Sequence, residues 1–590
     1  MDRPQVIVLP RTERSRLLRA YRRVVPRPVR GLVARRMSPE YRNRILERVV
    51  TGGFLRRVSD RAAAVWWRMR RPGVMGAPGR VLVRDGRRRC VAEIRTNPAP
   101  IEAQRENLAY VCAGLRAAGV EFFRVRGHDD LGSAVAVAES DRARVLAALR
   151  ASAGAVYLHL PGDPRRKGPR LRPGFAASSW HAFAHERVIR FARYLAAPGG
   201  GLVLGPEYGC DLEFWAEDGD CLVAPRSNRV TETVRRDGTT VMQPERRFTR
   251  FSTADRPCHP TRPEFAVRLI DDVRFPIDVV YTWVDDHDRA WRAHRDEALA
   301  RLGAVPMNRE AANASRFVSR DELRYSLRSL ALYAPWVRHI WLVTAGQVPD
   351  WLDSRAPGIT VVDHREIFRG QGRLPTFNSH AIESQLHHID GLAEHCLYVN
   401  DDVFFGRPVL PGHFFHSNGM AHFFLSRVHV DPGPVTFDDP PVMAAGKNNR
   451  HLIEEAFGRT LTQKMKHVPH PLRRSVLAEM EVRFASELAA TAGHQFRDPA
   501  DISLPSALHH YYGYMTGRSM PGEIRYVYTD LADRDTPYRL RQVLSERSCD
   551  VFCLNDTDAD EATRVRQRRV IDWFLAAYFP MPGPYEKDSK

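Results

Sequence analysis

Two short acidic segments each follow an apolar run that is long enough to form a buried strand. Asp285-Asp286 comes after the run at 275–284, and Asn400-Asp401-Asp402 comes after the run at 396–399. Clustered carboxylates repel one another unless a cation or a basic group lies between them. Magnesium binds one or two carboxylates and completes its coordination with water and substrate phosphates. The two segments together predict a metal–phosphate site if the fold brings them to one edge of a sheet.

Two basic side chains further along the chain could act on a phosphate. His470 lies between two prolines, and a proline such as Pro471 is typical of the first position of a helix. This predicts His470 at or beside a helix N-terminus, where phosphate binds and a neutral imidazole can act as a base. The same cap also fits a purely structural role. Arg497 follows in a polar stretch, and because Arg is abundant in this chain its type alone does not single it out.

The segments that carry these residues alternate between strand and helix patterns. Four apolar runs predict strands, at 275–284, 339–344, 359–363 and 396–399. Amphipathic helices are predicted between them, one after a capping box at 319–322 and one from Ser379. This alternation is typical of a doubly wound, mostly parallel α/β sheet. In such a sheet ligands bind at the carboxyl ends of the strands, which is where both acidic segments fall.

Residues 80–250 are predicted to form a separate accessory α/β domain. It begins with a hairpin at 80–94 around the turn signal Asp85-Gly86. Asp211 and Glu213 alternate along a predicted strand, which fits a metal-binding pair or, more commonly, a solvated strand face. A Pro-rich stretch at 255–265 predicts a linker, and 270–590 then forms the domain that contains the acidic segments.

The first 75 residues predict a basic arm of two amphipathic helices. The chain of 590 residues has a net charge of +19, and residues 1–71 contribute 20 Arg against five acidic residues. Basic amphipathic helices bind anionic membrane surfaces, and the same pattern also fits an extension packed on its own protein. Nucleic acid is not an expected partner, because no recognisable binding module accompanies the charge.

Composition excludes several other classes of protein. Hydrophobic residues make up 43% and charged residues 27%, so the chain can bury a large core. It contains no run of about 18 apolar residues that could span a membrane and no recognisable secretory signal. Eight Cys are too few for a disulfide scaffold at this length. These features predict a cytoplasmic protein with reduced thiols, which the basic arm can hold at the inner face of a membrane.

Four segments resemble, in order, the characteristic regions of the Stealth family of sugar-phosphate transferases. This family includes bacterial capsule and exopolysaccharide phosphotransferases and the animal N-acetylglucosamine-1-phosphotransferase. The segments are IDVVYTWVDDHD (277–288), a long block at 319–352 that continues at 374–407, KHVPHPLRRSVLAEMEVRF with HQFRDPADIS (466–503), and CLND (553–556). They span about half of the chain. One departure is visible at Asp286-His287, because relatives usually have Gly or Asn next to the acid.

The resemblance implies a nucleotide-sugar-transferase-like α/β fold. It also implies transfer of a hexose-1-phosphate from a UDP-sugar donor to a hydroxyl of a glycan acceptor, leaving UMP, in the synthesis of an exopolysaccharide, capsule or cell-wall polysaccharide. Mg²⁺ (or Mn²⁺) would be the cofactor, with Asp401 and Asp402 as ligands. Asp402, His470 and Arg497 would be catalytic. The residues implied to hold the nucleotide are Tyr281, Thr282, Trp283, Asp285, Arg320 and Asp321.

Two assignments stay open at this point. Either Asp402 or His470 could be the base that deprotonates the acceptor. Arg497, magnesium and a helix N-terminus would oppose the charge that develops on the phosphoryl oxygens.

The alternative enzyme is a metal-dependent glycosyltransferase that transfers the sugar alone. The alternative outside enzymes is a polyanion- or membrane-binding protein whose α/β half is inert.

Overall fold

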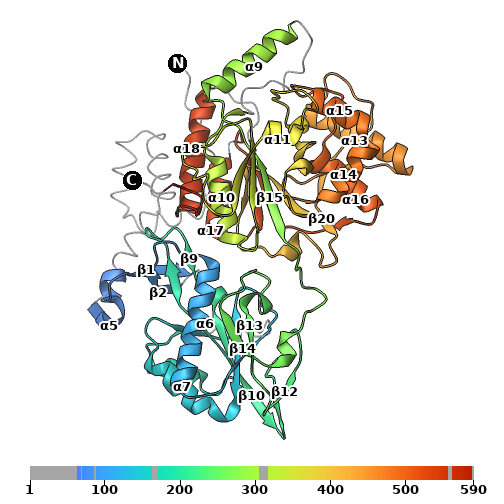
Figure 1. Cartoon of the computed structure of the whole chain (residues 1–590). Helices are drawn as coiled ribbons and strands as arrows, with labels where there is room; N and C mark the ends of the chain where they lie inside the picture. The colour runs from blue at the N-terminus through green and yellow to red at the C-terminus, as the bar shows by residue number, and fades with distance from the viewer. Residues whose placement is uncertain are drawn as a thin grey trace, which may run out of the picture. The chain divides into compact units, whose positions relative to one another are not determined.

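The structure is a computed structural model of the chain (Figure 1). It describes residues 63–67, 69–85, 88–161, 171–303, 317–533, 535–555 and 561–587. The chain divides into two compact units, residues 1–94 and 95–590. The arm predicted over residues 1–75 lies largely outside the described residues, which include the short helix α5 (Pro72–Met75).

In the first unit, β1 (Arg80–Asp85) and β2 (Arg88–Ile94) form the predicted antiparallel hairpin. Asp85 pairs with Arg88, and residues 86–87 between them lie outside the described residues. In the second unit, residues 270–590 are built on a five-stranded sheet with the order β17-β16-β15-β18-β23. The bounds of these strands are β15 (Ile277–Thr282), β16 (Ile340–Thr344), β17 (Ile359–Asp363), β18 (His395–Asn400) and β23 (His470–Arg473). The first four are parallel, as predicted, and β23 is antiparallel to β18.

Apolar side chains cover both faces of this sheet. Along β15, Val279 and Tyr281 belong to one apolar cluster and Val280 belongs to another, because alternate residues of a strand point to opposite faces. The first cluster includes residues of α10 (Glu322–Tyr333) and α18 (Glu561–Tyr578), and the second includes residues of α11 (His364–Phe368) and α14 (Arg474–Arg483). Figure 1 shows α10 and α18 on one side of β15 and α11 and α14 on the other. The chain therefore has a mixed α/β fold around a mostly parallel sheet.

Two predicted helix starts differ from the structure. Before α10, Asp321 makes no side-chain capping bond, and Glu322 instead accepts a hydrogen bond from the Arg320 N–H at 2.6 Å. The helix predicted from Ser379 is the short α12 (Ser379–Glu383), which is capped by Asn378.

A second, three-stranded sheet lies beside the turn that follows β18. Its order is β19-β26-β25, with β19 (Val403–Phe405), β26 (Val551–Asn555) and β25 (Tyr526–Asp530). Val403 pairs with Cys553, and the Leu554 N–H donates to the Asp402 carbonyl at 3.1 Å. This pairing and this hydrogen bond hold the C-terminal part of the chain against the turn that contains Asp402.

Residues 95–270 also contain both helices and strands, whereas the accessory domain was predicted over 80–250 and its hairpin at 80–94 belongs to the first unit. Two helices, α6 (Pro100–Ala117) and α7 (Arg142–Ala151), accompany a sheet in which β10 (Cys210–Asp218) pairs with β4 (Ser133–Ala138), β7 (Val188–Ala192) and β11 (Cys221–Val223). The smaller strands here are β3 (Phe123–Val125), β5 (Tyr157–His159), β8 (Tyr194–Ala196), β9 (Val203–Leu204), β12 (Thr233–Arg235) and β13 (Val241–Pro244). The Pro-rich stretch expected to be a linker contains β14 (Cys258–Thr261), which pairs with β13. Thr261 is buried and donates to the Arg124 carbonyl at 2.7 Å, so this stretch packs into the domain.

Asp211 and Glu213 are fully buried in β10, which contradicts a solvated strand face. Arg190 and Arg226 donate to Asp211 at 2.6 and 2.7 Å, and Arg226 and Trp215 donate to Glu213 at 2.8 and 3.0 Å. Because arginine and indole donors already occupy the carboxylate oxygens, these acids serve as partners of buried charge rather than as a metal-binding pair.

The remaining helices of residues 270–590 are α9 (Arg289–Leu302), α13 (Pro441–Phe457), α15 (Ala485–Gly493), α16 (His509–Met515) and α17 (Thr536–Glu546). Two further pairs of strands are β20 (Ala421–Phe423) with β24 (Ser519–Pro521) and β21 (Leu425–His429) with β22 (Gln463–Met465).

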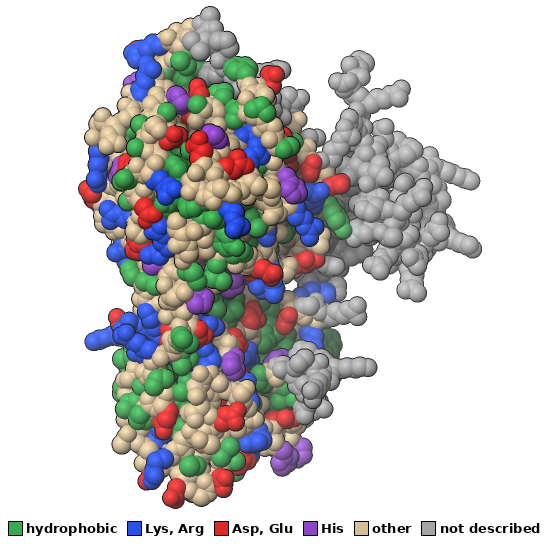
Figure 2. Space-filling view, turned by 90° about the vertical axis from the view of Figure 1, so that its right-hand side faces the viewer, with side chains coloured by type: hydrophobic (Ala, Val, Ile, Leu, Met, Phe, Trp, Pro, Cys, Tyr) green, Lys and Arg blue, Asp and Glu red, His purple; other side chains and the backbone are tan. Residues whose placement is uncertain are grey.

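Among the described residues, the helices are too short or too polar to cross a membrane. Figure 2 shows basic and acidic side chains interspersed over one face, in keeping with the small net charge outside residues 1–71.

Candidate active site

The strand order places the two acidic segments at a topological switch point. From β15 the chain proceeds to β16 and β17 on one side, and it returns as β18 on the other side of β15. Such a reversal creates a ligand-binding crevice at the carboxyl ends of the two central strands. Thr282 ends β15 directly opposite Asn400, the last residue of β18. The prediction that the turns with Asp285 and Asp402 share one sheet edge is confirmed.

Asp402 is the centre of a small polar cluster. Its Oδ1 lies 3.0 Å from Nε2 of His467, and its Oδ2 accepts a hydrogen bond from Cys553 Sγ at 3.4 Å. Burial raises the pKa of Cys553 well above its usual range, and the neighbouring Asp402 charge adds to this effect, so the thiol stays protonated. The Asp402 carboxylate is thus held between two donors in a half-buried position.

His467 reaches Asp402 because of the way β23 pairs. β23 runs antiparallel to β18 with His470 opposite Tyr398, so the residues before His470 extend past the carboxyl end of β18. Burial opposes protonation of the His467 imidazole. The charge of Asp402 and the hydrogen bond to it outweigh burial and raise the pKa of His467 above its ordinary value. Asp402 and His467 therefore form an ion pair when the imidazole is protonated.

Asp401 shares its surroundings with two further carboxylates. Burial raises the pKa of Asp401 well above its usual range, and repulsion from Glu322 and Asp402 raises it further. Burial also raises the pKa of Glu322, which opens α10, although the Arg320 charge opposes this shift. Repulsion among three carboxylates diminishes when a cation binds between them. The three carboxylates therefore lie close enough to repel one another at this strand end.

A chain of hydrogen bonds connects β15, β18 and α12 at the same edge. Thr282 Oγ1 donates to the Tyr398 hydroxyl at 3.1 Å, and that hydroxyl donates to Glu383 Oε1 at 3.1 Å. The other oxygen of Glu383 is buried and has no hydrogen-bond partner among the described residues. Burial raises the pKa of Glu383, and the nearby Arg497 and His467 oppose the shift. Glu383 is thus a further buried carboxyl group beside the Asp402 cluster.

Arg497 is positioned by a loop that Asp501 organises. Nη2 of Arg497 donates to Ser379 Oγ at 2.7 Å, at the start of α12. Asp501 is fully buried, accepts a hydrogen bond from Asn378 Nδ2 at 2.8 Å and lies 2.7 Å from His494 Nδ1. Burial opposes ionisation of Asp501, but hydrogen bonds from neighbouring histidines lower its pKa to about 2. The ionised Asp501 therefore fixes the loop that presents Arg497 toward Glu383.

The prediction that His470 lies at a helix cap is wrong. His470 begins strand β23, and α14 starts only at Arg474, because pairing with the edge of β18 extends the backbone through Pro471. The His470 side chain is 4% exposed, and its Nδ1 lies 3.1 Å from Nε2 of His510. Burial lowers its pKa well below the usual range, and the charges of neighbouring histidines add to this. His470 is a neutral, interior residue.

The residues expected to hold the nucleotide fall into two groups. Tyr281 and Trp283 are buried in an apolar cluster, and the Tyr281 hydroxyl lies 2.9 Å from Ser326 Oγ. These two side chains support β15 from inside the core. Thr282, between them, instead contacts Tyr398.

The other three expected nucleotide residues lie on the turns that follow β15 and precede α10. Gln347 clamps Asp285 by accepting from its N–H at 3.2 Å and donating to its carbonyl at 2.8 Å. Arg320 is buried 3.6 Å from the Glu322 carboxylate, and Asp321 is exposed with a φ of +64°. Asp285 and Asp321 are therefore accessible from solvent.

The departure at Asp286-His287 forms a local ion-pair cluster. Nδ1 of the exposed His287 lies 2.7 Å from Asp285 Oδ1 and 3.4 Å from Asp286 Oδ1. Burial raises the pKa of Asp286, with His287 opposing this shift. A protonated His287 can therefore neutralise part of the charge of this turn.

Sequence reasoning missed several members of the site, namely His467, Cys553, Glu383, Tyr398 and Glu322. His467 stands three residues before His470 in KHVPHP, and Cys553 opens CLND, so both lie inside motifs that were recognised. Cys553 donates a hydrogen bond to Asp402, a role that its position in the motif does not reveal. Glu383 and Tyr398 carry no local signal, because their roles depend on contacts between separate segments.

Comparison with protein families identifies four regions of the chain. Residues 275–303, 316–423, 466–514 and 541–590 match the Stealth protein conserved regions 1, 2, 3 and 4, respectively. A galactosyltransferase, LgtC, solved with donor and acceptor sugar analogues, aligns over 51% of this chain and 95% of its own. The identity is 11% and the TM-score is 0.27, which is too low to relate the two folds.

Similar curated proteins span nearly the whole chain. An exopolysaccharide phosphotransferase of Streptomyces coelicolor is 44% identical over 98% of both chains. The exopolysaccharide phosphotransferase CpsY of Mycobacterium tuberculosis is 34% identical over 85% of this chain and 92% of its own. Together with the four ordered regions, these matches show that the chain belongs to the Stealth family of phosphotransferases.

Proposed function

We propose that this protein transfers a hexose-1-phosphate from a UDP-sugar to a hydroxyl of a glycan acceptor in the synthesis of an extracellular or cell-wall polysaccharide. Its relatives are named exopolysaccharide phosphotransferases. The observation that carries the proposal is the Asp402–His467 pair at the switch point of the sheet, beside Arg497 and three clustered carboxylates. The reaction takes place in the cytoplasm, where nucleotide sugars are made.

Asp402 is the general base in this proposal. Its carboxylate is half-buried, lies at the strand end where ligands bind, and is oriented by His467 and Cys553. The acceptor hydroxyl attacks the β-phosphorus of the donor and gives its proton to Asp402, while the bond between the two phosphates breaks and UMP leaves. Asp402 is preferred over His470, because the His470 ring is buried against His510.

Two cations of the chain oppose the negative charge that develops on the phosphoryl oxygens. His467 is protonated more readily than an ordinary histidine, and Arg497 keeps its charge at all relevant pH values. Phosphoryl transfer depends mainly on positioning and on electrostatic stabilisation of this kind. His470 acts as a positioning residue, because it starts the strand whose preceding segment carries His467.

We further propose that a divalent cation such as Mg²⁺ or Mn²⁺ binds at Asp401 and Asp402, beside the Glu322 carboxylate. Burial raises the pKa of Asp401, and repulsion from Glu322 and Asp402 adds to this shift. Oxygen atoms are the ligands that these hard cations prefer. When bound, the cation supplies charge neutralisation for the donor phosphates. The turns with Asp285 and Asp321, together with Thr282 and Arg320, form the proposed nucleotide-binding surface.

The fate of the β-phosphate tests the reaction class. Incubation of the full chain with Mg²⁺, acceptor glycan and UDP-sugar labelled at the β-phosphate should place the label in the glycan and release UMP. EDTA should abolish the transfer. Release of the label as UDP would instead identify a glycosyltransferase, which transfers the sugar alone.

Variants test the assigned roles in the same assay. Asp402→Asn should lower kcat by more than about a hundredfold, the typical contribution of a general base, whereas Asp438→Asn, an exposed acid, should not change it. Arg497→Lys should be impaired because Lys cannot form a bidentate contact with phosphate, whereas the exposed Arg459→Lys should be active. Wild-type turnover by Asp402→Asn would remove Asp402 from the mechanism.

A further inference from the structure

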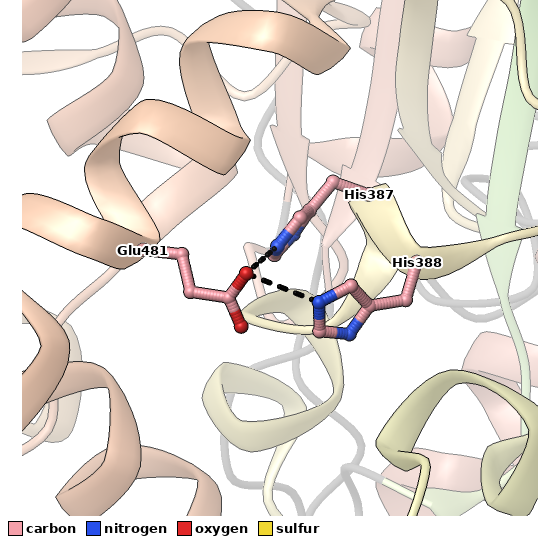
Figure 3. Close-up of side chains that lie close together, drawn as sticks. All are labelled: His387, His388 and Glu481. Atoms are coloured by element: carbon pink, nitrogen blue, oxygen red, sulfur yellow. Dashed lines mark hydrogen bonds and ion pairs between the residues drawn. The ribbon is translucent and has the colours of Figure 1, made fainter.

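Two adjacent histidines and a glutamate converge at a place that the proposed reaction does not use. His387 and His388 end the short 3₁₀ helix Leu386–His388, and Glu481 lies in α14. Figure 3 shows both imidazole rings directed at the Glu481 carboxylate. Oε2 of Glu481 lies 2.8 Å from Nε2 of His387 and 3.1 Å from Nε2 of His388.

This cluster is separate from the Asp402 site. His387 and His388 precede β18, whereas Asp402 follows its end, and the six residues of β18 span about 20 Å. The His387 side chain is 2% exposed, that of His388 13% and that of Glu481 30%, so the cluster is closed on the histidine side and open beside Glu481.

The hydrogen bonds of His388 point to a cation. Its Nδ1 lies 2.9 Å from the Ile367 carbonyl, which can only accept, so Nδ1 carries the proton. In a neutral imidazole Nε2 then holds a lone pair, and it faces a carboxylate oxygen. Two acceptors at 3.1 Å repel each other unless the ring takes a second proton or a metal ion binds between them. A backbone carbonyl that orients the distal N–H is the usual surrounding of a metal-bound histidine.

The geometry fits a small transition-metal ion. In a tetrahedral zinc site with ligand distances of about 2.0–2.1 Å, neighbouring ligand atoms are about 3.3 Å apart. The three ligand atoms of this cluster lie within 4.8 Å of one another, and two of the separations are 2.8 and 3.1 Å. Arg474, the basic neighbour, donates to the His387 and Leu392 carbonyls.

We propose that His387, His388 and Glu481 bind one Zn²⁺ ion, with water as the fourth ligand. The site is structural, because it ties α14 to the segment that leads into β18. It thereby joins the segment before β18, which leads to Asp402, to the helix that follows β23. This inference is independent of the proposed reaction, since its tests measure metal and stability rather than turnover.

Metal binding by the full chain tests the proposal. After removal of bound metals by a chelator, the protein is titrated with ZnCl₂ by calorimetry and with Co²⁺, whose tetrahedral complexes absorb visible light. His388→Gln and Glu481→Gln should each weaken zinc binding at this site by more than about a hundredfold, because loss of a ligand exceeds the typical effect of an outer-shell change. They should also lose the Co²⁺ absorption.

Two controls separate this site from others. His451→Gln removes a surface histidine that also faces a glutamate, with Nε2 3.2 Å from Glu455 Oε1, but without a second histidine. Cys553→Ser alters the Asp402–His467–Cys553 group, another set of side chains in the described part of the chain that could bind a metal ion. Both variants should keep the zinc equivalent and the zinc-dependent rise in melting temperature. The proposal is overturned if the wild type binds no zinc, or if His388→Gln and Glu481→Gln bind it as the wild type does, in which case His388 is simply the cationic partner of Glu481.

Discussion

Replacement of His467 by Gln tests the Asp402–His467 pair most directly. Gln retains a side-chain N–H that can donate to Asp402 but cannot carry a charge. The lost interaction is a charge-assisted hydrogen bond of 3.0 Å between partly buried groups. Hydrogen bonds to charged groups contribute about 1.5–3 kcal/mol, which corresponds to about a 10- to 150-fold change in rate. We therefore expect kcat/KM of His467→Gln to fall by about this factor, toward its lower end because solvent screens the pair.

The pH dependence distinguishes charge from mere orientation. Because the pKa of His467 is raised, the imidazolium is present below that pKa and is lost as the pH rises through it. The wild type should accordingly show an alkaline fall in kcat/KM at a pH above the ordinary histidine value of about 6.5. In His467→Gln this fall should disappear, leaving a low, flat rate in that range.

The assay is the initial rate of labelled phosphate transfer across the pH range, with melting temperatures to confirm that each variant is folded. His451→Gln is the matched control, because His451 is exposed and also contacts a carboxylate. It should keep both the wild-type rate and the alkaline fall. If His467→Gln keeps the same alkaline fall as the wild type, another group titrates there, and the assigned role of His467 is refuted.

Further predictions concern stability, redox state and the basic arm. His470→Ala should lower the melting temperature as well as the rate, because it leaves a cavity and removes the contact with His510. A large loss of rate without a change in melting temperature would instead support His470 as the base. Asp501→Ala should destabilise the protein at neutral pH. The lowered pKa of Asp501 means that its ionised carboxylate stabilises the fold above pH about 4, and this stabilisation is lost as the pH falls toward 2. In an acid titration, the difference in stability between the variant and the wild type should therefore become smaller at low pH. Thiol titration of the denatured, unreduced protein should find close to eight thiols, because none of the cysteines forms a disulfide in the structure; a count near four would overturn the cytoplasmic assignment. Removal of residues 1–74 should abolish co-sedimentation with anionic liposomes while the rate with a soluble acceptor is kept, and equal sedimentation would assign the arm to another role.

The sheet and its functional edge could be predicted from the sequence because buried strands are recognisable as short runs of apolar residues. A strand covered on both faces is mostly apolar, so the sequences of β15 and β18 are recognisable as buried strands. The acidic turn directly after each one marks the strand end. Parallel pairing then brings those ends together without further information. The start of α14 could not be predicted in this way. Pro471 fits a helix start locally, but pairing of His470–Arg473 with the edge of β18 supplies hydrogen bonds that an isolated helix turn would lack.

The surroundings of Asp402 explain why four separated sequence regions occur together in this chain. One oxygen of Asp402 faces His467 from the third region, and the other accepts from Cys553 in the fourth. Thr282 from the first region meets Tyr398 of the second at the adjoining strand ends. Because each region forms a different side of one site, the sequence of a single region does not predict which histidine contacts Asp402. The chain contains 23 histidines, so composition does not identify it either. The antiparallel pairing of the short strand β23 with β18 places His467, rather than His470, next to Asp402.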